Sequence, residues 1–115
     1  MNPARPMPGA RLFAFADLDD GEGRAFDFRS GEALFSLIAV RQGERIIAYE
    51  NDCPHARQPL ERFDGRVVMM EQRYLVCSAH GASFRVEDGV CVGGPAKGGL
   101  TPFPVAVRDG DVFAA

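Results

Sequence analysis

The sequence is poor in several residue types, and each shortage narrows what the protein can be. It has no tryptophan, two histidines and three cysteines among 115 residues. No apolar stretch approaches the roughly 20 residues that a membrane-spanning helix requires, so we expect no membrane contact. The net charge is only −3 and no basic run occurs, so we expect no nucleic-acid partner.

The chain also lacks the patterns of a secreted protein and of an enzyme. Its first nine residues hold three prolines and a glycine, with no apolar segment behind Arg5. We therefore predict a flexible lead-in over residues 1–10 rather than a secretory signal. Three cysteines give no disulfide framework, which favours the reducing cytoplasm. No phosphate loop, nucleotide fingerprint or nucleophile–base pattern is present, so no catalytic residue is predicted.

Both histidines closely follow a cysteine, and these four residues form the strongest pattern in the chain. Cys53-Pro54-His55 and Cys77-Ser78-Ala79-His80 are separated by a spacer of 21 residues. Two thiolates and two imidazoles can hold a structural zinc ion or a two-iron two-sulfur cluster. A zinc finger usually keeps its cysteines together and its histidines together, whereas each box here supplies one of each. The order favours the cluster, and a structural zinc module is the alternative.

This pattern resembles the Rieske iron–sulfur family, and the resemblance extends beyond the ligand types. Gly81 follows the second histidine, Phe84 comes three residues later, and Gly94-Pro95 ends a third loop. The resemblance implies one Rieske-type 2Fe-2S cluster per chain, with the boxes at hairpin tips and a proline-containing loop over the cluster. Its metal and cofactor ligands would be Cys53, His55, Cys77 and His80. The spacer is several residues longer than is common in the family, which suggests an enlarged hairpin between the boxes.

Short alternating segments separated by turn residues predict an all-β protein. We expect strands over 11–15, 24–29, 33–41, 45–50, 67–70, 73–76, 84–86, 90–92, 104–108 and 111–114. The hairpin turns expected between them are Gln42-Gly43, Glu71-Gln72, Asp88-Gly89 and Asp109-Gly110. No window has sustained helical periodicity.

These elements predict one domain over residues 1–115, with a Rieske-like antiparallel β-sandwich or barrel as its base. A small cluster-binding subdomain is expected as an insertion at about residues 51–95. Met69 and Met70 are expected in the core. Cys91 stands outside both boxes and is expected to be a small buried hydrophobe.

The resemblance also implies an electron-transfer function. High-potential relatives add a cysteine to each box, a serine after the glycine and a tyrosine two residues further on, whereas this chain has Ala79, Ala82 and Phe84 there. We therefore expect a low-potential, monomeric carrier that resembles a Rieske-type ferredoxin. It would pass single electrons from a flavin-dependent reductase to a terminal oxygenase. The alternative is an accessory module similar to the small subunit of nitrite reductases.

Overall fold

The computed structural model describes residues 2–52, 65–71, 73–77, 81–94 and 98–115. These residues form short strands and one 3-10 turn, η1 (Phe15–Asp17), and they contain no α-helix. The strands are β1 (Arg11–Ala14), β2 (Gly23–Ser30), β3 (Ala33–Gln42), β4 (Arg45–Glu50), β5 (Val68–Met70), β6 (Tyr74–Val76), β7 (Ser83–Arg85), β8 (Cys91–Gly93), β9 (Val105–Arg108) and β10 (Asp111–Ala114). The predicted all-β class is confirmed. No helix in this part of the chain is long and apolar enough to cross a membrane.

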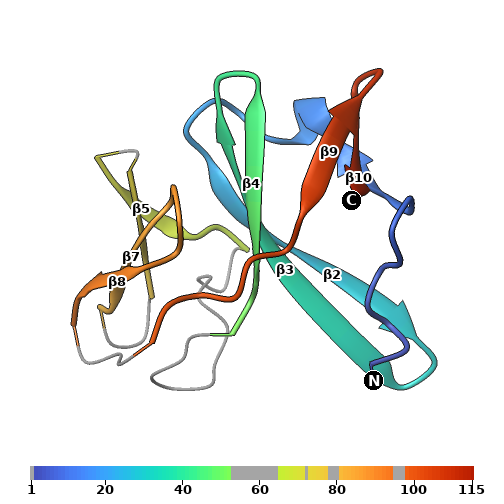
Figure 1. Cartoon of the computed structure of the whole chain (residues 1–115), viewed down its shortest axis with the longest axis horizontal. Coiled ribbons are helices and arrows are strands. Elements are labelled where there is room, and N and C mark those ends of the chain that lie inside the picture. Colours follow the sequence, from blue (N-terminus) through green and yellow to red (C-terminus); the bar gives the residue numbers. More distant parts are fainter. Residues whose placement is uncertain (1, 53–64, 72, 78–80, 95–97) are drawn as a thin grey trace.

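The strands form three antiparallel sheets, in the orders β1-β10-β9, β2-β3-β4 and β5-β6-β7-β8. In Figure 1 the long β2 and β3 run through the middle of the molecule, with β9 and β10 to one side and the β5–β8 sheet to the other. We call the first two sheets the base and the four-stranded sheet the small unit. All four strands of the small unit fall between residues 68 and 93.

The middle strand β3 is buried on both faces and therefore belongs to two cores. Leu37 and Ala39 pack into a first core with residues of β1, β4 and β10. Ile38 and Val40 point the other way, into a second core with residues of the small unit. Successive side chains of a strand point to opposite faces, so an uninterrupted apolar run can serve two cores at once. The base and the small unit therefore share the sheet formed by β2, β3 and β4.

The first strand departs from simple alternation. Leu12 and Phe13 are neighbours in sequence, yet both are buried. The pairing of β1 with β10 shifts register between Arg11 and Phe13, which turns both side chains inward. The ring of Phe13 then stacks on Phe26 of β2, with ring centroids 4.1 Å apart.

Three hairpin turns differ from the sequence prediction. The strands expected at 84–86 and 90–92 are β7, which ends at Arg85, and β8, which begins at Cys91, so their loop is longer than the predicted turn at Asp88-Gly89. Gln42 pairs with Arg45, so the two loop residues between β3 and β4 are Gly43 and Glu44, one position later than expected. The shift places Gly43, at φ 63°, first in the loop, where only glycine takes such a conformation readily. Met70 pairs with Tyr74, so the β5–β6 loop is one residue longer than predicted.

The last hairpin confirms its predicted turn. Asp109 and Gly110 both have positive φ, 53° and 81°, and they join β9 to β10. Asp-Gly is the dipeptide that favours this geometry in a two-residue hairpin loop. At this turn, unlike the three others, the sequence alone predicts the register of the strands.

The small unit is attached to the edge of the base sheet at its start. The N–H of Val67 donates to the carbonyl of Gly23, and the N–H of Ala25 donates to that of Gly65, both at 3.0 Å. A Cβ on Gly23 would lie 3.0 Å from the sulfur of Met69, so glycine allows close packing here. The chain segment before β5 thus runs beside β2.

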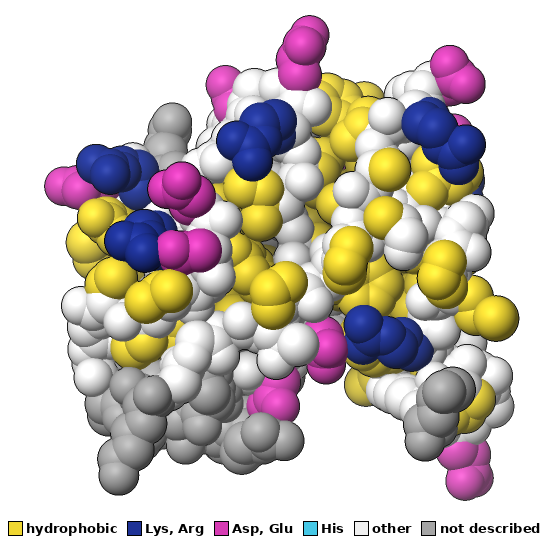
Figure 2. All heavy atoms as spheres, viewed as in Figure 1, with side chains coloured by type: hydrophobic (Ala, Val, Ile, Leu, Met, Phe, Trp, Pro, Cys, Tyr) yellow, Lys and Arg dark blue, Asp and Glu magenta, His cyan; other side chains and the backbone are white. Residues whose placement is uncertain are grey.

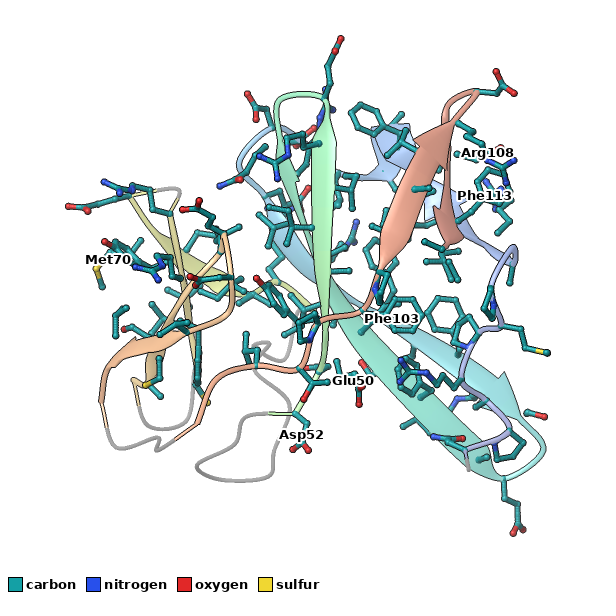
Figure 3. The ribbon with its side chains drawn as sticks, in the orientation of Figure 1. Glu50, Asp52, Met70, Phe103, Arg108 and Phe113 are labelled. Carbon is teal, nitrogen blue, oxygen red and sulfur yellow. The ribbon has the colours of Figure 1, made fainter. Side chains whose placement is uncertain are left out.

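The segment predicted as a lead-in packs against the base along part of its length. The Arg5 guanidinium lies 5.0 Å from the ring centroid of Phe35 and 4.9 Å from that of Phe103. It also pairs with Glu50 at 3.0 Å. Figure 3 shows Phe103 in the space between β9 and β3, with Glu50 near the end of β4.

Two side chains of the small unit are less buried than the sequence suggested. Met69 packs against the second core, but Met70 is 50% exposed and points away from the molecule (Figure 3). Cys91 is half-buried, and its Sγ lies 3.3 Å from the carbonyl oxygen of Gly93. β5 alternates inward and outward, so only Met69 of the two neighbouring methionines reaches the core. Cys91 packs against the same core with part of its side chain exposed. Across the face shown in Figure 2, arginines and acidic side chains are interspersed.

Candidate metal centre

One of the four predicted ligands lies in the described part of the chain. Cys77 follows directly on β6 and is 1% exposed. Cys53, His55 and His80 lie outside the described residues. Among the described residues, no three His, Cys, Asp or Glu side chains come together as a metal site. Within that part of the chain, the candidate centre is therefore described through Cys77 and the segments that flank the other ligands.

Cys77 stands at the base of a tight loop between β6 and β7. Its N–H donates to the carbonyl of Ala82 at 2.8 Å, and its own carbonyl accepts from the N–H of Gly81 at 2.9 Å. Gly81 has a φ of 74°, which glycine adopts without strain. Val76 pairs with Ser83, so the two strands hold the ends of the loop together. β6 and β7 thus form a hairpin, and the residues of the second box after Cys77 lie between these strands in the sequence but outside the described residues.

The third loop approaches the second box through its glycine. Gly94 has a φ of 82°, and a Cβ at this position would lie 2.6 Å from the Cα of Ala82 and 3.2 Å from the carbonyl oxygen of Gly81. No side chain larger than hydrogen fits there without moving the backbone. The chain just before Pro95 therefore lies directly against Gly81 and Ala82, the two residues that follow the second box. Pro95 itself, and with it the predicted covering loop, lies outside the described residues.

The surroundings of Cys77 are apolar. Ala82 and Phe84 are fully buried beside it in the second core, together with Leu75. Among the described side chains of that core, Tyr49 alone carries a hydroxyl group, and it is engaged elsewhere. A buried thiol in an apolar, glycine-lined hairpin loop suits a thiolate ligand of an iron–sulfur cluster, which requires a shielded site and close backbone approach. The residues present fit the group that the sequence predicts.

The segment that leads into the first box is fixed to the base. The N–H of Asn51 donates to the carbonyl of Ser36, and its side-chain amide donates to the Ser36 hydroxyl, both at 3.0 Å. The Asn51 side chain is buried, and its amide N–H is paired by the bond to the Ser36 hydroxyl. Cys53 comes two residues later, so the chain enters the first box from a residue that is held in place by these hydrogen bonds.

Tyr49 is a residue that sequence reasoning placed in a strand without assigning it a role. It is 2% exposed, and its hydroxyl donates a 2.6 Å hydrogen bond to the carbonyl of Val86. Burial raises the pKa of Tyr49 to about 12, and the nearby carboxylates of Asp88 and Glu87 add to the effect. The contact joins residues 37 positions apart, so no local pattern in the sequence could reveal it.

The turn below Tyr49 is closed by an ion pair. The Arg85 guanidinium donates two hydrogen bonds to the Asp88 carboxylate, from Nε to Oδ1 and from Nη2 to Oδ2. The Oδ1 atom of Asp88 also accepts from the N–H of Val90. These bonds lower the pKa of Asp88, with the Arg85 hydrogen bond as the main cause. Both side chains face solvent, so the pair shapes the β7–β8 turn more than it stabilises the fold.

Fold and site together define an iron–sulfur protein of the Rieske type, and the comparison with known families agrees. The family described as Rieske [2Fe-2S] domain matches residues 11–104. The chain belongs to this family, and its cofactor is a Rieske-type 2Fe-2S cluster. The family and cofactor predictions are confirmed.

Similar proteins include ferredoxins, one of them named as the subunit of a dioxygenase. The 3-phenylpropionate/cinnamic acid dioxygenase ferredoxin subunit of Escherichia coli (strain K12) is 30% identical over 105 residues, which cover 90% of this chain and 91% of the relative. Ferredoxin CarAc of Metapseudomonas resinovorans is 30% identical over 107 residues, 91% of each chain.

Solved structures show the same fold. The ferredoxin of carbazole 1,9a-dioxygenase from Nocardioides aromaticivorans IC177 has a TM-score of 0.77 at 23% identity and covers 95% of this chain and 98% of its own. A chain in the complex of reduced oxygenase and oxidized ferredoxin in carbazole 1,9a-dioxygenase has a TM-score of 0.74 at 28% identity, covering 91% and 99%.

Proposed function

We propose that this protein is a low-potential carrier of single electrons in an oxygenase system. The observation that carries the proposal is the match in length to dioxygenase ferredoxins, which the chain covers to 91% at 30% identity. The same fold also forms part of the terminal oxygenase of carbazole 1,9a-dioxygenase, but there this chain covers only 30% of the solved chain. The extent of the match therefore corresponds to the ferredoxin component rather than to the oxygenase.

The proposed ligands are Cys53 and Cys77 on one iron and His55 and His80 on the other. When bound, the cluster supplies a centre that accepts and releases one electron at a time. Cys77 would contribute a thiolate from a buried position, and Gly94 keeps the backbone of the third loop close to the second box. The apolar side chains of Ala82 and Phe84 exclude water from this side.

The proposed potential is at the low end of the range for this cluster type, roughly −150 to +300 mV. Hydrogen bonds to cluster sulfurs stabilise the reduced state and raise the potential. Ala82 and Phe84 have no hydroxyl to donate, and both are fully buried, so water does not take over that role at these positions. The fold therefore offers no side-chain donor at either place.

The proposed partners are a flavin-dependent reductase, which would supply electrons, and a terminal oxygenase, which would receive them. Support comes from relatives named as dioxygenase ferredoxin subunits and from a similar chain in a complex of oxygenase and ferredoxin. We propose a cytoplasmic location, because a thiolate ligand at Cys77 requires a cysteine that is kept reduced.

Metal and sulfide analysis of the purified protein tests the proposal directly. Protein made with sufficient iron should be red-brown and contain two iron and two acid-labile sulfide per chain, as a 2Fe-2S cluster requires. Dithionite should bleach it and produce the EPR signal of a reduced Rieske cluster. One zinc per chain and no sulfide would establish the structural zinc module instead.

A second measurement separates the carrier from an accessory subunit of a reductase. Added to a flavin-dependent reductase and a dioxygenase that lacks its ferredoxin, the protein should restore substrate hydroxylation in proportion to its concentration. A protein with an intact cluster that restores no turnover with any dioxygenase of the related systems, but co-purifies with a nitrite-reductase-type partner, would favour the accessory role.

A further inference from the structure

Tyr49 occupies the point where the segments flanking the predicted cluster loops meet. It is the second-to-last residue of β4, which ends at Glu50, three residues before Cys53. Its ring fills the second core, and its hydroxyl reaches the carbonyl of Val86. Val86 directly follows β7, the strand that leaves the second box. One buried hydrogen bond therefore connects the strand that enters the first box with the strand that leaves the second.

The partner carbonyl belongs to a backbone that is already held in place. The N–H of Val86 donates to the carbonyl of Arg73 at 2.8 Å, on the far side from Tyr49. Val86 thus has its amide bound within the small unit and its carbonyl bound to the base. A phenylalanine at position 49 would fill the same space but leave this buried carbonyl without its donor.

The third loop is connected to the same residue. A Cβ on Gly89 would lie 2.7 Å from the Cε1 atom of Tyr49, so the β7–β8 turn rests directly on the ring. The carbonyl of Gly89 accepts from the N–H of Leu100 at 2.9 Å, and Pro102 pairs with Tyr49 along the backbone. The segment that leaves the third loop is therefore fixed against Tyr49 as well.

From these contacts we infer that Tyr49 is a positioning residue for the cluster site. It holds the segments of the two ligand boxes and of the covering loop in fixed relative positions, and through them it sets how the ligands meet the cluster. The inference rests on the ligand set given under Proposed function. Tyr49 would act through the backbone of these segments, since its hydroxyl is bonded to the carbonyl of Val86.

The test compares three variants of the full chain, each purified with its cluster. Tyr49→Phe removes the hydroxyl alone. Tyr74→Phe is the matched control at the one other tyrosine of the chain. Ile38→Val removes one methylene from the same second core without touching this hydrogen bond, and it controls for a general loss of stability. For each variant, the EPR g-values and linewidths, the reduction potential, the rate of cluster loss to a chelator and the thermal midpoint are measured.

Tyr49→Phe should shift or broaden the EPR signal, move the potential and lose its cluster about two- to tenfold faster, the factor that one hydrogen bond permits. Tyr74→Phe and Ile38→Val should keep the wild-type signature even where their midpoints fall. A folded Tyr49→Phe protein without any cluster, beside a loaded Ile38→Val, would also support the inference.

Two results would overturn it. One is a Tyr49→Phe protein with only a lower thermal midpoint and an unchanged signal, potential and rate of cluster loss. The other is the same spectral change, or loss of the cluster, in Ile38→Val. Both results leave the proposed function standing, whereas wild-type protein without iron and sulfide would overturn the proposed function itself.

Discussion

At the scale of single residues, the two kinds of ligand have different consequences when they are exchanged. His80→Cys offers a second thiolate to the iron that His80 would hold, and the added negative charge should lower the potential of any cluster that is retained. His55→Ala removes a donor, so its cluster should be lost or labile. Iron and sulfide content and redox titration measure both effects.

Cys91 provides the control for these ligand variants. Its half-buried thiol lies in β8, outside both boxes, so Cys91→Ser should keep a full cluster with wild-type spectra. Complete retention with unchanged spectra in His55→Ala would remove His55 from the ligand set.

Tyr49 also makes stability depend on pH in alkaline solution. Its pKa in the folded protein is about 12, whereas an unfolded tyrosine has a pKa of about 10. The raised pKa favours the protonated, folded form, so this stabilisation is complete below about pH 10 and is lost as the pH rises towards 12. A shift of this size corresponds to about 2–3 kcal/mol of unfolding free energy.

Denaturant unfolding of wild type and Tyr49→Phe between pH 9 and about 12 measures this contribution. The wild-type free energy of unfolding should fall more steeply, and the two curves should converge at the alkaline end. Tyr74→Phe retains Tyr49 and should follow the wild-type slope. Parallel curves for wild type and Tyr49→Phe would show that the hydroxyl titrates alike in the folded and unfolded chain.

At the scale of elements, the β7–β8 turn depends on a glycine for two separable reasons. Gly89 has a φ of 76°, and its missing side chain leaves room for the Tyr49 ring. Gly89→Ala should therefore cost both backbone strain and a steric clash, about 2–4 kcal/mol together. Gly110→Ala, at a φ of 81° with nothing within 4 Å, should cost only the strain of about 1–2 kcal/mol.

Thermal or denaturant unfolding gives the loss of unfolding free energy in each glycine variant. The difference between the two losses is the cost of the clash between the Gly89→Ala side chain and the Tyr49 ring. Equal losses of stability would mean that the ring moves aside without cost. In that case the turn and β4 would be less firmly coupled than their distances indicate.

At the scale of the whole molecule, the two cores should unfold together because they share β3. Leu37→Ala removes a fully buried side chain from the first core and should cost about 2–5 kcal/mol. At about 4 °C or more per kcal/mol for a domain of this size, the midpoint should fall by at least about 8 °C. Leu34→Ala, in the same strand but 46% exposed, should change it little.

Cluster absorbance and far-UV circular dichroism, followed in the same thermal scan, test the coupling. In Leu37→Ala both signals should shift to lower temperature by the same amount, although Leu37 lies in the core away from Cys77. An unchanged midpoint for cluster absorbance would show that the small unit unfolds independently of the base.

The sequence by itself determined the features that depend on neighbouring residues. Alternation gave the strands, Asp109-Gly110 gave its turn, and two cysteine–histidine boxes indicated the cofactor, because each of these depends on a few consecutive side chains. Where several local solutions are nearly equal, the sequence placed a turn one position too early, as at Gly43, or put an exposed side chain in the core, as at Met70. A shift of one residue exchanges the two faces of a strand, so pairing partners decide such cases.

Only the tertiary structure decided how the described segments that flank the three predicted loops are held relative to one another. The double use of β3, the approach of Gly94 to Ala82 and the bond from Tyr49 to Val86 all join residues that are far apart in the chain. Such contacts form because apolar faces of separate sheets must be buried against something and buried polar groups must be paired. The sequence does not show which residues will bury a given apolar face or pair a given polar group. Only the packed fold brings those residues together.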